Sequence, residues 1–443
     1  MKILIAIHHF PPSFTGGAEW EAYNTAAALQ ARGHSVRVVC VEQIHRGCAP
    51  PGQLRWQDSE YRGIPVRRLS FDLSSAPDPF VWSYDNAWVG EHFRSLITEF
   101  QPDVMHLLGG YLLTAQPLIA AHQLGVPTVV SLMDFWFLCS RISMLRSDGE
   151  LSTLPINPQQ CARCVGEERR SLKWLGENLP TVAEWYWRRQ QAQAEKYAVR
   201  LSVLRSALNQ ADAIINRSHF VRKLFVQAGF APERFTFIRQ GRDFPAFTSA
   251  ELAKTPAQHL RVGYLGQIAQ HKGVHVLLEA TRQLPHAALT VKIYGNTQAF
   301  PAYTQKLHRL IGSDNRLELT GAYSGQAELL TILQELDVLV VPSLWYENSP
   351  NVILEAFAHQ TPVLVSNLGG MAELVTDGVD GLHFAAGDSA DLARCLQRLI
   401  DEPDLLPRLR AGIRPVKTLA QEMDELEAVY RQVIGQTVGM LLV

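Results

Sequence analysis

Short apolar runs alternate with amphipathic stretches along most of this chain, and the alternation limits the folds that it can adopt. The runs KILIAI, HSVRVVCV, DVMHLL and PTVVSL come early, and RVGYLG, LTVKIYG, DVLVVPS and PVLVS follow later. Runs rich in Val, Ile and Leu are typical of strands that are buried on both faces, and helical stretches between them predict βα repetition around a parallel sheet. The expected fold class is α/β.

The βα series occurs twice, which predicts two Rossmann-like, doubly wound domains. The polar, Pro-containing stretch RDFPAFTSAELAKTPAQH separates the series, the second begins near Leu260, and 443 residues exceed one ordinary core. We expect a first domain over 1–245, a second over 246–414, and a ligand cleft between the carboxyl ends of their strands. A helix from about Leu419 to Val433, within 415–443, is expected to pack back on the first domain.

The composition argues against several classes of protein. Lys and Arg total 41 against 43 Asp and Glu, so no basic field would attract nucleic acid. The opening run MKILIAIHHFPP is too short for a signal peptide, and no apolar run reaches the length of a membrane span. With six scattered cysteines that look like thiols, the sequence indicates a cytoplasmic protein.

The stretch SLWYENSPNVILEAFAHQTPV, residues 343–363, predicts a helix that starts near Ser349. The Ser349 side chain is expected to cap the free amides, and Pro350 suits the first helical position. That first turn contains no acid, so the positive end of the helix dipole is left for an anion. Glu355 follows in an otherwise apolar segment, and a buried carboxylate needs a partner.

The free amides of Asn351 and Val352 could hold phosphate oxygens, and Glu355, one turn deeper, could accept hydrogen bonds from the vicinal hydroxyls of a ribose. Glu347 would then face the sugar beyond the phosphates. The alternative is that Glu347 is a solvated loop residue and that Glu355 belongs to an ion pair. We favour the ligand-binding interpretation, because the helix is apolar and its first turn has no acid.

Three other turns at strand ends could approach the same ligand. Gly16 and Gly17 follow the first strand, Lys272 lies in the turn that begins at Gly266, and Gly295 follows LTVKIY. Glycines let backbone amides come close to a phosphate, and a lysine can neutralise one. For each turn alone, a plain glycine turn or an exposed lysine is the alternative, and no GxGxxG dinucleotide fingerprint is present.

Three segments resemble the family 4 retaining glycosyltransferases (glycosyltransferases group 1), which have the GT-B fold. These segments are GGAEWEAYNTAAALQARGHSVRVV, GYLGQIAQHKGVHVLLEA and PSLWYENSPNVILEAFAHQTPVLVSNLGGMAELVTDGVDGLHFAAGD. The resemblance runs from Met1 to about Ile400, and its most specific part is the E-x7-E element, Glu347 to Glu355. It implies transfer of a hexose from a nucleotide sugar to a saccharide or lipid-linked acceptor, in envelope polysaccharide or glycolipid biosynthesis.

The resemblance also implies roles for individual residues. Glu347 and Asp134 would be catalytic, Lys272 would bind the diphosphate, Glu355 would hold the ribose, and the region from Thr320 to Tyr323 would lie near the base. The implied donor-binding set is Gly16, Gly17, Gly266, Gln267, Lys272, Gly295, Tyr323, Asn348, Ser349, Pro350, Asn351, Val352 and Glu355. The base stays open, and UDP, GDP and ADP sugars are all candidates.

The chain departs from the family at two positions. Gln267 stands where many members have Arg, and Arg239 or Arg242 could supply the missing charge. Met133 stands where the family has a His that meets the donor sugar. The sugar therefore stays open, and two alternatives remain: a nucleotide-sugar epimerase of the same fold, or a catalytically silent nucleotide-sugar-binding protein.

The expected mechanism needs neither a metal nor a cofactor. No DxD pair follows a strand, so Lys272 and the helix end would stabilise the leaving diphosphate. In the family's retaining chemistry, the acceptor hydroxyl attacks from the face that the diphosphate leaves, and the departing phosphate takes its proton. Glu347 would then position groups and balance charge.

An insertion in the first domain, at about 139–205, contains three cysteines that suggest a zinc site. CARC supplies Cys161 and Cys164 at metal-knuckle spacing, and Cys139 lies in the same region. Ser152 stands where similar proteins often have another cysteine. Three thiolates make an incomplete site, so we do not predict a bound metal.

The same insertion groups aromatic and basic residues. Trp174, Trp185, Tyr186 and Trp187 accompany Arg188 and Arg189. Such a group suits a membrane interface, which predicts possible peripheral association with the inner face of the cell membrane. We favour the alternative that these rings pack the insertion onto the first domain.

Overall fold

The computed structural model describes residues 1–245, 252, 254 and 257–441, which form two compact units. Unit 1 comprises Met1–Arg239 together with Leu419–Val443, and unit 2 comprises Gln240–Thr418. The chain thus leaves unit 1, builds unit 2 and returns.

Unit 1 is built on an eight-stranded sheet with the order β3-β4-β2-β1-β5-β6-β7-β8. Its strands are β1 (Lys2–Ile7), β2 (Ser35–Gln43), β3 (Leu54–Tyr61), β4 (Ile64–Phe71), β5 (Val104–Leu108), β6 (Thr128–Ser131), β7 (Ala213–Asn216) and β8 (Phe235–Phe237). Neighbouring strands are parallel except β3 and β4, which pair antiparallel. The strand order reverses between β1 and β5, the point where ligands bind in doubly wound sheets.

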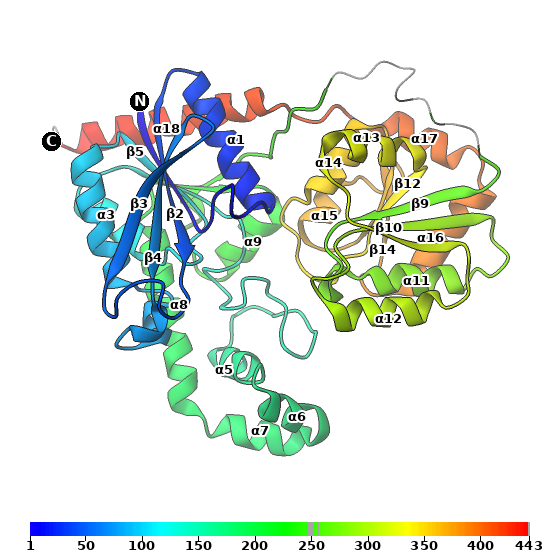
Figure 1. Cartoon of the computed structure of the whole chain (residues 1–443), viewed down its shortest axis with the longest axis horizontal. Helices are drawn as coiled ribbons and strands as arrows, with labels where there is room; N and C mark the ends of the chain where they lie inside the picture. Colours follow the sequence, from blue (N-terminus) through cyan, green and yellow to red (C-terminus); the bar gives the residue numbers. More distant parts are fainter. Residues whose placement is uncertain (246–251, 253, 255–256, 442–443) are drawn as a thin grey trace. The chain divides into compact units, whose positions relative to one another are not determined.

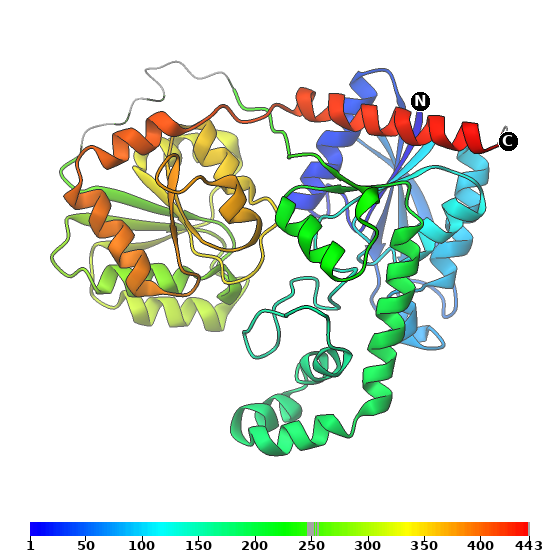
Figure 2. The same ribbon diagram turned by 180° about the vertical axis from the view of Figure 1, so that it is seen from behind.

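Helices α1 (Gly17–Ala31), α2 (Pro79–Trp82), α3 (Ala87–Phe100), α4 (Gln116–Gln123), α9 (His219–Gln227) and α18 (Leu419–Leu441) also belong to unit 1. The insertion lies between β6 and β7 and contains α5 (Pro158–Gly166), α6 (Arg170–Asn178), α7 (Pro180–Arg188) and α8 (Gln191–Asn209). In both whole-chain views, α8 leads from the sheet to α6 and α7 at its far end (Figures 1 and 2).

Unit 2 contains a wholly parallel six-stranded sheet with the order β11-β10-β9-β12-β13-β14. The strands are β9 (Leu260–Leu265), β10 (Leu289–Tyr294), β11 (Leu317–Gly321), β12 (Val338–Val341), β13 (Val363–Ser366) and β14 (Gly381–Phe384). Helices α11 (Val274–Arg282), α12 (Pro301–Ile311), α16 (Ser389–Asp401) and α17 (Leu405–Gly412) pack into one core, and α13 (Gly325–Glu335), α14 (Asn351–Ala358) and α15 (Gly369–Leu374) into another (Figure 1). The predicted class, α/β with two Rossmann-like doubly wound domains, is confirmed.

The sequence analysis did not predict strands β3 and β4, because neither sequence is a continuous apolar run. Two arginines interrupt β4, yet Arg67 is buried and Arg68 is largely covered. The guanidinium of Arg67 donates twice to the Asp58 carboxylate, at 2.7 and 2.8 Å, and Arg68 donates to Glu42 at 2.8 Å. Ion pairs thus let charged residues occupy this edge of the sheet.

The segment that follows Arg239 belongs to unit 2, so the boundaries differ from the expected 245 and 414. The side-chain amide of Gln240 donates to the Asn351 side chain at 3.0 Å. The backbone N–H of Arg242 donates to the carbonyl of Lys417 at 2.8 Å, which joins the outgoing and returning connections. These contacts place 240–245 and 415–418 with unit 2.

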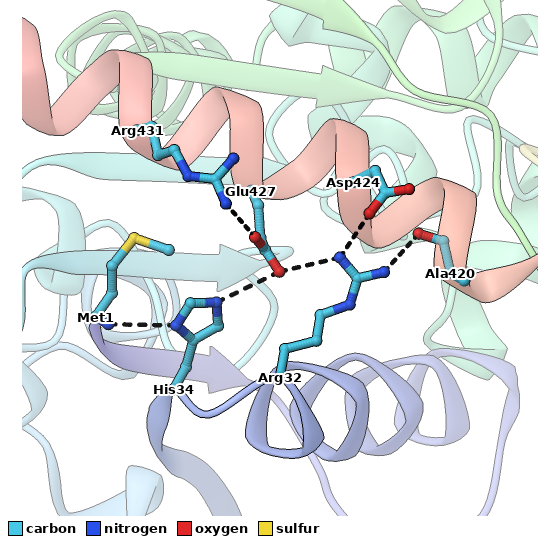
Figure 3. A network of polar contacts seen from close by, with 7 residues as sticks. All are labelled: Met1, Arg32, His34, Ala420, Asp424, Glu427 and Arg431. Carbon is cyan, nitrogen blue, oxygen red and sulfur yellow. Dashed lines mark hydrogen bonds and ion pairs between the residues drawn. The ribbon is translucent and has the colours of Figure 1, made fainter.

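Helix α18 packs on the core of unit 1 and continues to Leu441, beyond the expected end near Val433 (Figure 2). The Tyr430 hydroxyl lies 2.7 Å from Nδ1 of His106, and both side chains are fully buried. Figure 3 shows a second attachment: the Glu427 carboxylate contacts Arg32 at 3.0 Å, His34 at 3.4 Å and Arg431. Helix α18 therefore completes unit 1.

Glu427 is 6% exposed. Burial alone would raise the pKa of this carboxyl, but hydrogen bonds from Arg32 and His34, and their charges, outweigh it and lower the pKa. A lowered folded-state pKa means that the ionised group stabilises the fold above the unfolded-state pKa, and that this stabilisation is lost as the pH falls through the folded-state value.

We expect Glu427→Gln to reduce the free energy of unfolding by about 1–2 kcal/mol at neutral pH, because Arg32 loses a charged partner. The difference should vanish at pH values below the folded-state pKa. Urea denaturation at several pH values measures it. Asp424→Asn is the matched control, because Asp424 pairs with the same arginine but its side chain is 71% exposed; its effect should stay within about 0.5 kcal/mol. Equal losses in both variants would contradict the prediction.

Candidate active site

The expected donor-binding residues of unit 2 lie at the carboxyl edge of its sheet. Gly266 follows β9, Gly295 follows β10, and Glu347 lies in the loop between β12 and α14. The strand order reverses between β9 and β12, so Gly266 and Glu347 follow the two strands that flank this point (Figure 1). Ligands of doubly wound sheets bind there.

Lys272 and Glu347 form a close ion pair. The Lys272 ammonium lies 2.6 Å from Oε1 of Glu347, and the same oxygen accepts hydrogen bonds from Ser343 at 2.8 Å and Trp345 at 2.7 Å. Glu347 is 9% exposed, so the alternative of a solvated loop residue is wrong. Burial alone would raise the pKa of Glu347, but Lys272 and these hydrogen bonds outweigh it and lower the pKa.

Two glycine turns hold the Glu347 loop in place. Gly273 has φ +71°, and a Cβ there would lie 1.8 Å from the carbonyl oxygen of Pro342, so only glycine fits beside the end of β12. The N–H of Gly370 donates to the Glu347 carbonyl at 2.9 Å, and a Cβ at Gly370 would lie 1.9 Å from the carbonyl oxygen of Asn348. The Gly369–Gly370 turn is therefore structural.

Helix α14 begins at Asn351, and the expected cap at Ser349 is wrong. Pro350 is the N-cap residue, with an extended conformation (φ −64°, ψ 117°), and no side chain caps the helix. Ser349 is thereby displaced from the position that reaches the first amides, and its buried hydroxyl has no hydrogen-bond partner. As expected, the first turn contains no acid. The amide of Ile353 donates to the Pro350 carbonyl at 3.1 Å, whereas the amides of Asn351 and Val352 precede the first bonds of the helix.

Glu355 forms an ion pair with Arg242 at 2.8 Å, which is the alternative that the sequence left open. The carboxylate is 7% exposed, and its burial raises the pKa of Glu355, although the Arg242 guanidinium opposes the rise. Burial and the nearby Glu355 charge raise the pKa of Tyr323 to about 12. Arg239 lies instead in unit 1, over the ring of Phe237.

The two glycines after β9 and β10 approach each other. A Cβ at Gly295 would lie 2.1 Å from the carbonyl oxygen of Gly266, so the two turns touch through their backbones. Next to them, the Gln267 carbonyl accepts a hydrogen bond from the Tyr264 hydroxyl at 2.8 Å.

The remaining expected residues lie in unit 1. Gly16 is the N-cap residue of α1 and Gly17 begins this helix. Asp134 follows β6, and its carboxylate accepts a hydrogen bond from the N–H of Trp136 at 2.8 Å. Burial raises the pKa of Asp134. Met133, which replaces the family's His, packs against the core of unit 1.

The structure adds a pair that the sequence did not reveal, His8 and Glu19. Nε2 of His8 lies 3.2 Å from Oε1 of Glu19, and Nδ1 is buried without a hydrogen-bond partner. His8 directly follows β1, one of the strands at the reversal point of unit 1. A Cβ at Gly16 would lie 2.5 Å from Oε2 of Glu19, so glycine makes room for this carboxylate. The only signal in the sequence was a His-His step at the end of a strand.

The three cysteines of the insertion, Cys139, Cys161 and Cys164, line one pocket together with Ser152. Burial raises the pKa of Cys161 to about 12, with smaller contributions from Cys139 and Cys164, so its thiol stays protonated. Within the part of the chain that the structure describes, no three His, Cys, Asp or Glu side chains are arranged to hold a metal ion.

Two family models match the chain. The model described as "Glycosyl transferase 4-like domain" matches residues 16–241, and "Glycosyl transferases group 1" matches residues 259–402. A glycogen synthase of Mycobacterium tuberculosis is 27% identical over 436 residues, which cover 94% of this chain and 89% of the relative. The lipopolysaccharide core biosynthesis glycosyltransferase LpsE of Rhizobium meliloti is 31% identical over 158 residues, 35% of this chain and 44% of that protein.

Solved structures share the fold over the whole chain. HepE of Anabaena in complex with UDP has a TM-score of 0.61 at 19% identity, covering 100% of this chain and 99% of HepE. Sucrose-phosphate synthase of Thermosynechococcus elongatus has a TM-score of 0.65 at 18% identity, covering 98% and 100%. Because the first family model alone matches half of the sequence and the GT-B fold extends over both units, the chain belongs to the group 1, family 4 glycosyltransferases.

Proposed function

We propose that this glycosyltransferase is a retaining, metal-independent hexosyltransferase that uses a nucleotide-sugar donor. The observation that carries the proposal is the arrangement around α14, where two buried carboxylates and two cations border a helix start without an acid. A diphosphate would supply the missing negative charge at the helix start. Lys272 is near enough to Glu347 to be shared between that carboxylate and the diphosphate.

In this proposal, Glu355 binds the ribose of the donor. A buried carboxylate can accept both vicinal hydroxyls of a ribose, and Arg242 holds that position in the structure. Tyr323, next to Glu355, would border the base. The nucleotide is open among UDP, GDP and ADP.

The chemical step forms a bond between the acceptor oxygen and the anomeric carbon, and breaks the bond from that carbon to the diphosphate. The acceptor's proton passes to the departing phosphate oxygen. Lys272 and the α14 amides stabilise the leaving group without a divalent metal. Glu347, whose lowered pKa keeps it ionised, would balance the positive charge that develops on the sugar.

The acceptor is proposed to be a saccharide or lipid-linked saccharide in envelope polysaccharide or glycolipid biosynthesis, on the cytoplasmic side of the cell membrane. The similarity to LpsE, named for lipopolysaccharide core biosynthesis, supports this class. Asp134 and the His8–Glu19 pair of unit 1 offer hydrogen-bonding groups for sugar hydroxyls.

The donor is identified by thermal-shift screening against UDP, GDP and ADP sugars, because a ligand that binds only the folded state raises the melting temperature with its concentration. Nucleotide-release assays on the hits, with and without saccharide acceptors, then test transfer. An epimerase would convert the donor without any acceptor. A silent binding protein would bind the donor and never release the nucleotide. Either result would contradict the proposal.

Glu347→Gln is expected to lower kcat about 10²–10³-fold, because the charge that balances the transition state is lost. The donor KM should change only a few-fold. Steady-state nucleotide release measures both constants. Glu335→Gln is the matched control, since Glu335 is an exposed glutamate of α13 in the same unit. A Glu347→Gln enzyme with normal kcat would remove Glu347 from the site.

Glu355→Ala is expected to weaken nucleotide binding about 10–100-fold, because hydrogen bonds to a charged group contribute roughly 1.5–3 kcal/mol. At saturating donor, kcat should stay within a few-fold of the wild-type value. Calorimetric titration with the nucleoside diphosphate separates binding from catalysis. Unchanged affinity would show that the ribose is bound elsewhere.

Arg242→Ala is expected to raise the donor KM and to make donor binding dependent on pH. Without the guanidinium, the already raised pKa of Glu355 rises further, and the protonated carboxyl loses part of its capacity to accept hydrogen bonds. Binding should therefore recover as the pH increases, and Arg242→Lys should retain most of the affinity. A larger effect from Arg239→Ala would assign the compensating charge to Arg239 instead.

A further inference from the structure

Helices α6 and α7, with the residues that flank them (169–189), form a hairpin at the far end of the insertion (Figures 1 and 2). Four large apolar side chains of this hairpin face solvent. Trp174 and Trp185 are each 57% exposed, and Leu179 and Val182 are each 45% exposed. Exposed tryptophans grouped with aliphatic residues in this way indicate a surface that meets a partner.

Packing of the insertion explains only some of its aromatic rings. Trp187 is 5% exposed and forms a small core with Ala162, Ala183 and Tyr197. A Cβ at Gly166 would lie 2.0 Å from the Trp187 ring, so this core is tightly packed. Helix α7 thus directs Ala183 and Trp187 into the core, while Val182 and Trp185 face outward. The expectation that the rings pack the insertion is wrong for Trp174 and Trp185.

Exposed basic residues lie on the same two helices and their flanks as the exposed apolar ones. The exposed cations of the hairpin are Arg169, Arg170, Lys173, Arg188 and Arg189. Its acids are Glu177 and Glu184. The Arg189 guanidinium lies 3.8 Å from the centre of the Trp185 ring, so charge and aromatic surface are presented together. Tryptophan beside lysine and arginine suits the headgroup region of an anionic bilayer, where rings enter the interface and cations meet phosphates.

We propose that the α6–α7 hairpin docks this protein on an anionic membrane surface. Trp174, Leu179, Val182 and Trp185 enter the headgroup region, and the cations of the hairpin contact lipid phosphates. Docking is peripheral: in the described ranges of the chain, no helix is both long and apolar enough to cross a bilayer. An anionic bilayer is the partner that matches the charge of the hairpin, where five exposed cations outnumber two acids.

The test is co-sedimentation of the 443-residue chain with vesicles of phosphatidylglycerol and phosphatidylcholine, and with vesicles of phosphatidylcholine alone. We expect the wild type to bind the anionic vesicles at low salt and the neutral vesicles far less. The double variant Trp174→Ser/Trp185→Ser should bind the anionic vesicles about tenfold more weakly. Circular dichroism checks that it is folded, which is expected because neither ring belongs to the small core.

Trp56→Ser is the matched control, because Trp56 is 52% exposed on β3, outside the insertion; its binding should equal that of the wild type. A second variant, Arg169→Gln/Arg170→Gln/Lys173→Gln, should weaken binding and reduce its dependence on salt. Two results would overturn the proposal: no sedimentation of the wild type with anionic vesicles, or unchanged binding of the double tryptophan variant. Loss of a concentration-dependent dimer in the double variant would assign the surface to a second copy of this chain. None of these measurements depends on sugar transfer.

Discussion

A buried carboxylate stays ionised only when a cation or several hydrogen-bond donors lie next to it, and unit 2 contains two such carboxylates beside one short helix. Lys272 reaches Glu347 from the turn after β9, and Arg242 reaches Glu355 from the segment that enters the unit. Gly273 and Gly370 let the turn after β9 and the start of α15 approach the loop that carries Glu347. The ion pairs therefore join the strand ends, α14 and the connection into one arrangement.

This arrangement has a consequence for donor binding. The structure contains each glutamate paired with a cation, so the polar groups assigned to the donor satisfy one another. An entering donor would replace some of these protein–protein contacts with its own, and both glutamates and both cations would already be charged. The ribose would take over acceptor positions on Glu355, and the diphosphate would share Lys272. Arg242 lies in the segment that enters unit 2, and its N–H donates a hydrogen bond to the carbonyl of Lys417 in the segment that leaves it. The proposed ribose position is therefore linked directly to both segments.

The sequence predicts the parallel sheets, the two series of strands and the carboxylates near α14, because those features depend on local periodicity and short motifs. Contacts between distant segments were not predictable. The pairing of Arg242 with Glu355 and of His8 with Glu19 arises from tertiary folding. The error at Ser349 has a local cause, the extended conformation of Pro350. The sequence shows that the tryptophans of the insertion are grouped. Only the packing of α7 shows that Trp187 is buried and that Trp185 is exposed.

Unit 2 is inserted into unit 1, and this order affects synthesis of the protein. The six strands of unit 2 are consecutive in the chain, so all of them are synthesised before α18. The part of the unit 1 core that Met423, Leu426, Tyr430 and Val433 cover stays open during that time, and His106 lacks its tyrosine. Domains generally fold as units during translation. Here the domain that begins first is completed only after the other, so apolar surface of unit 1 stays uncovered until α18 emerges.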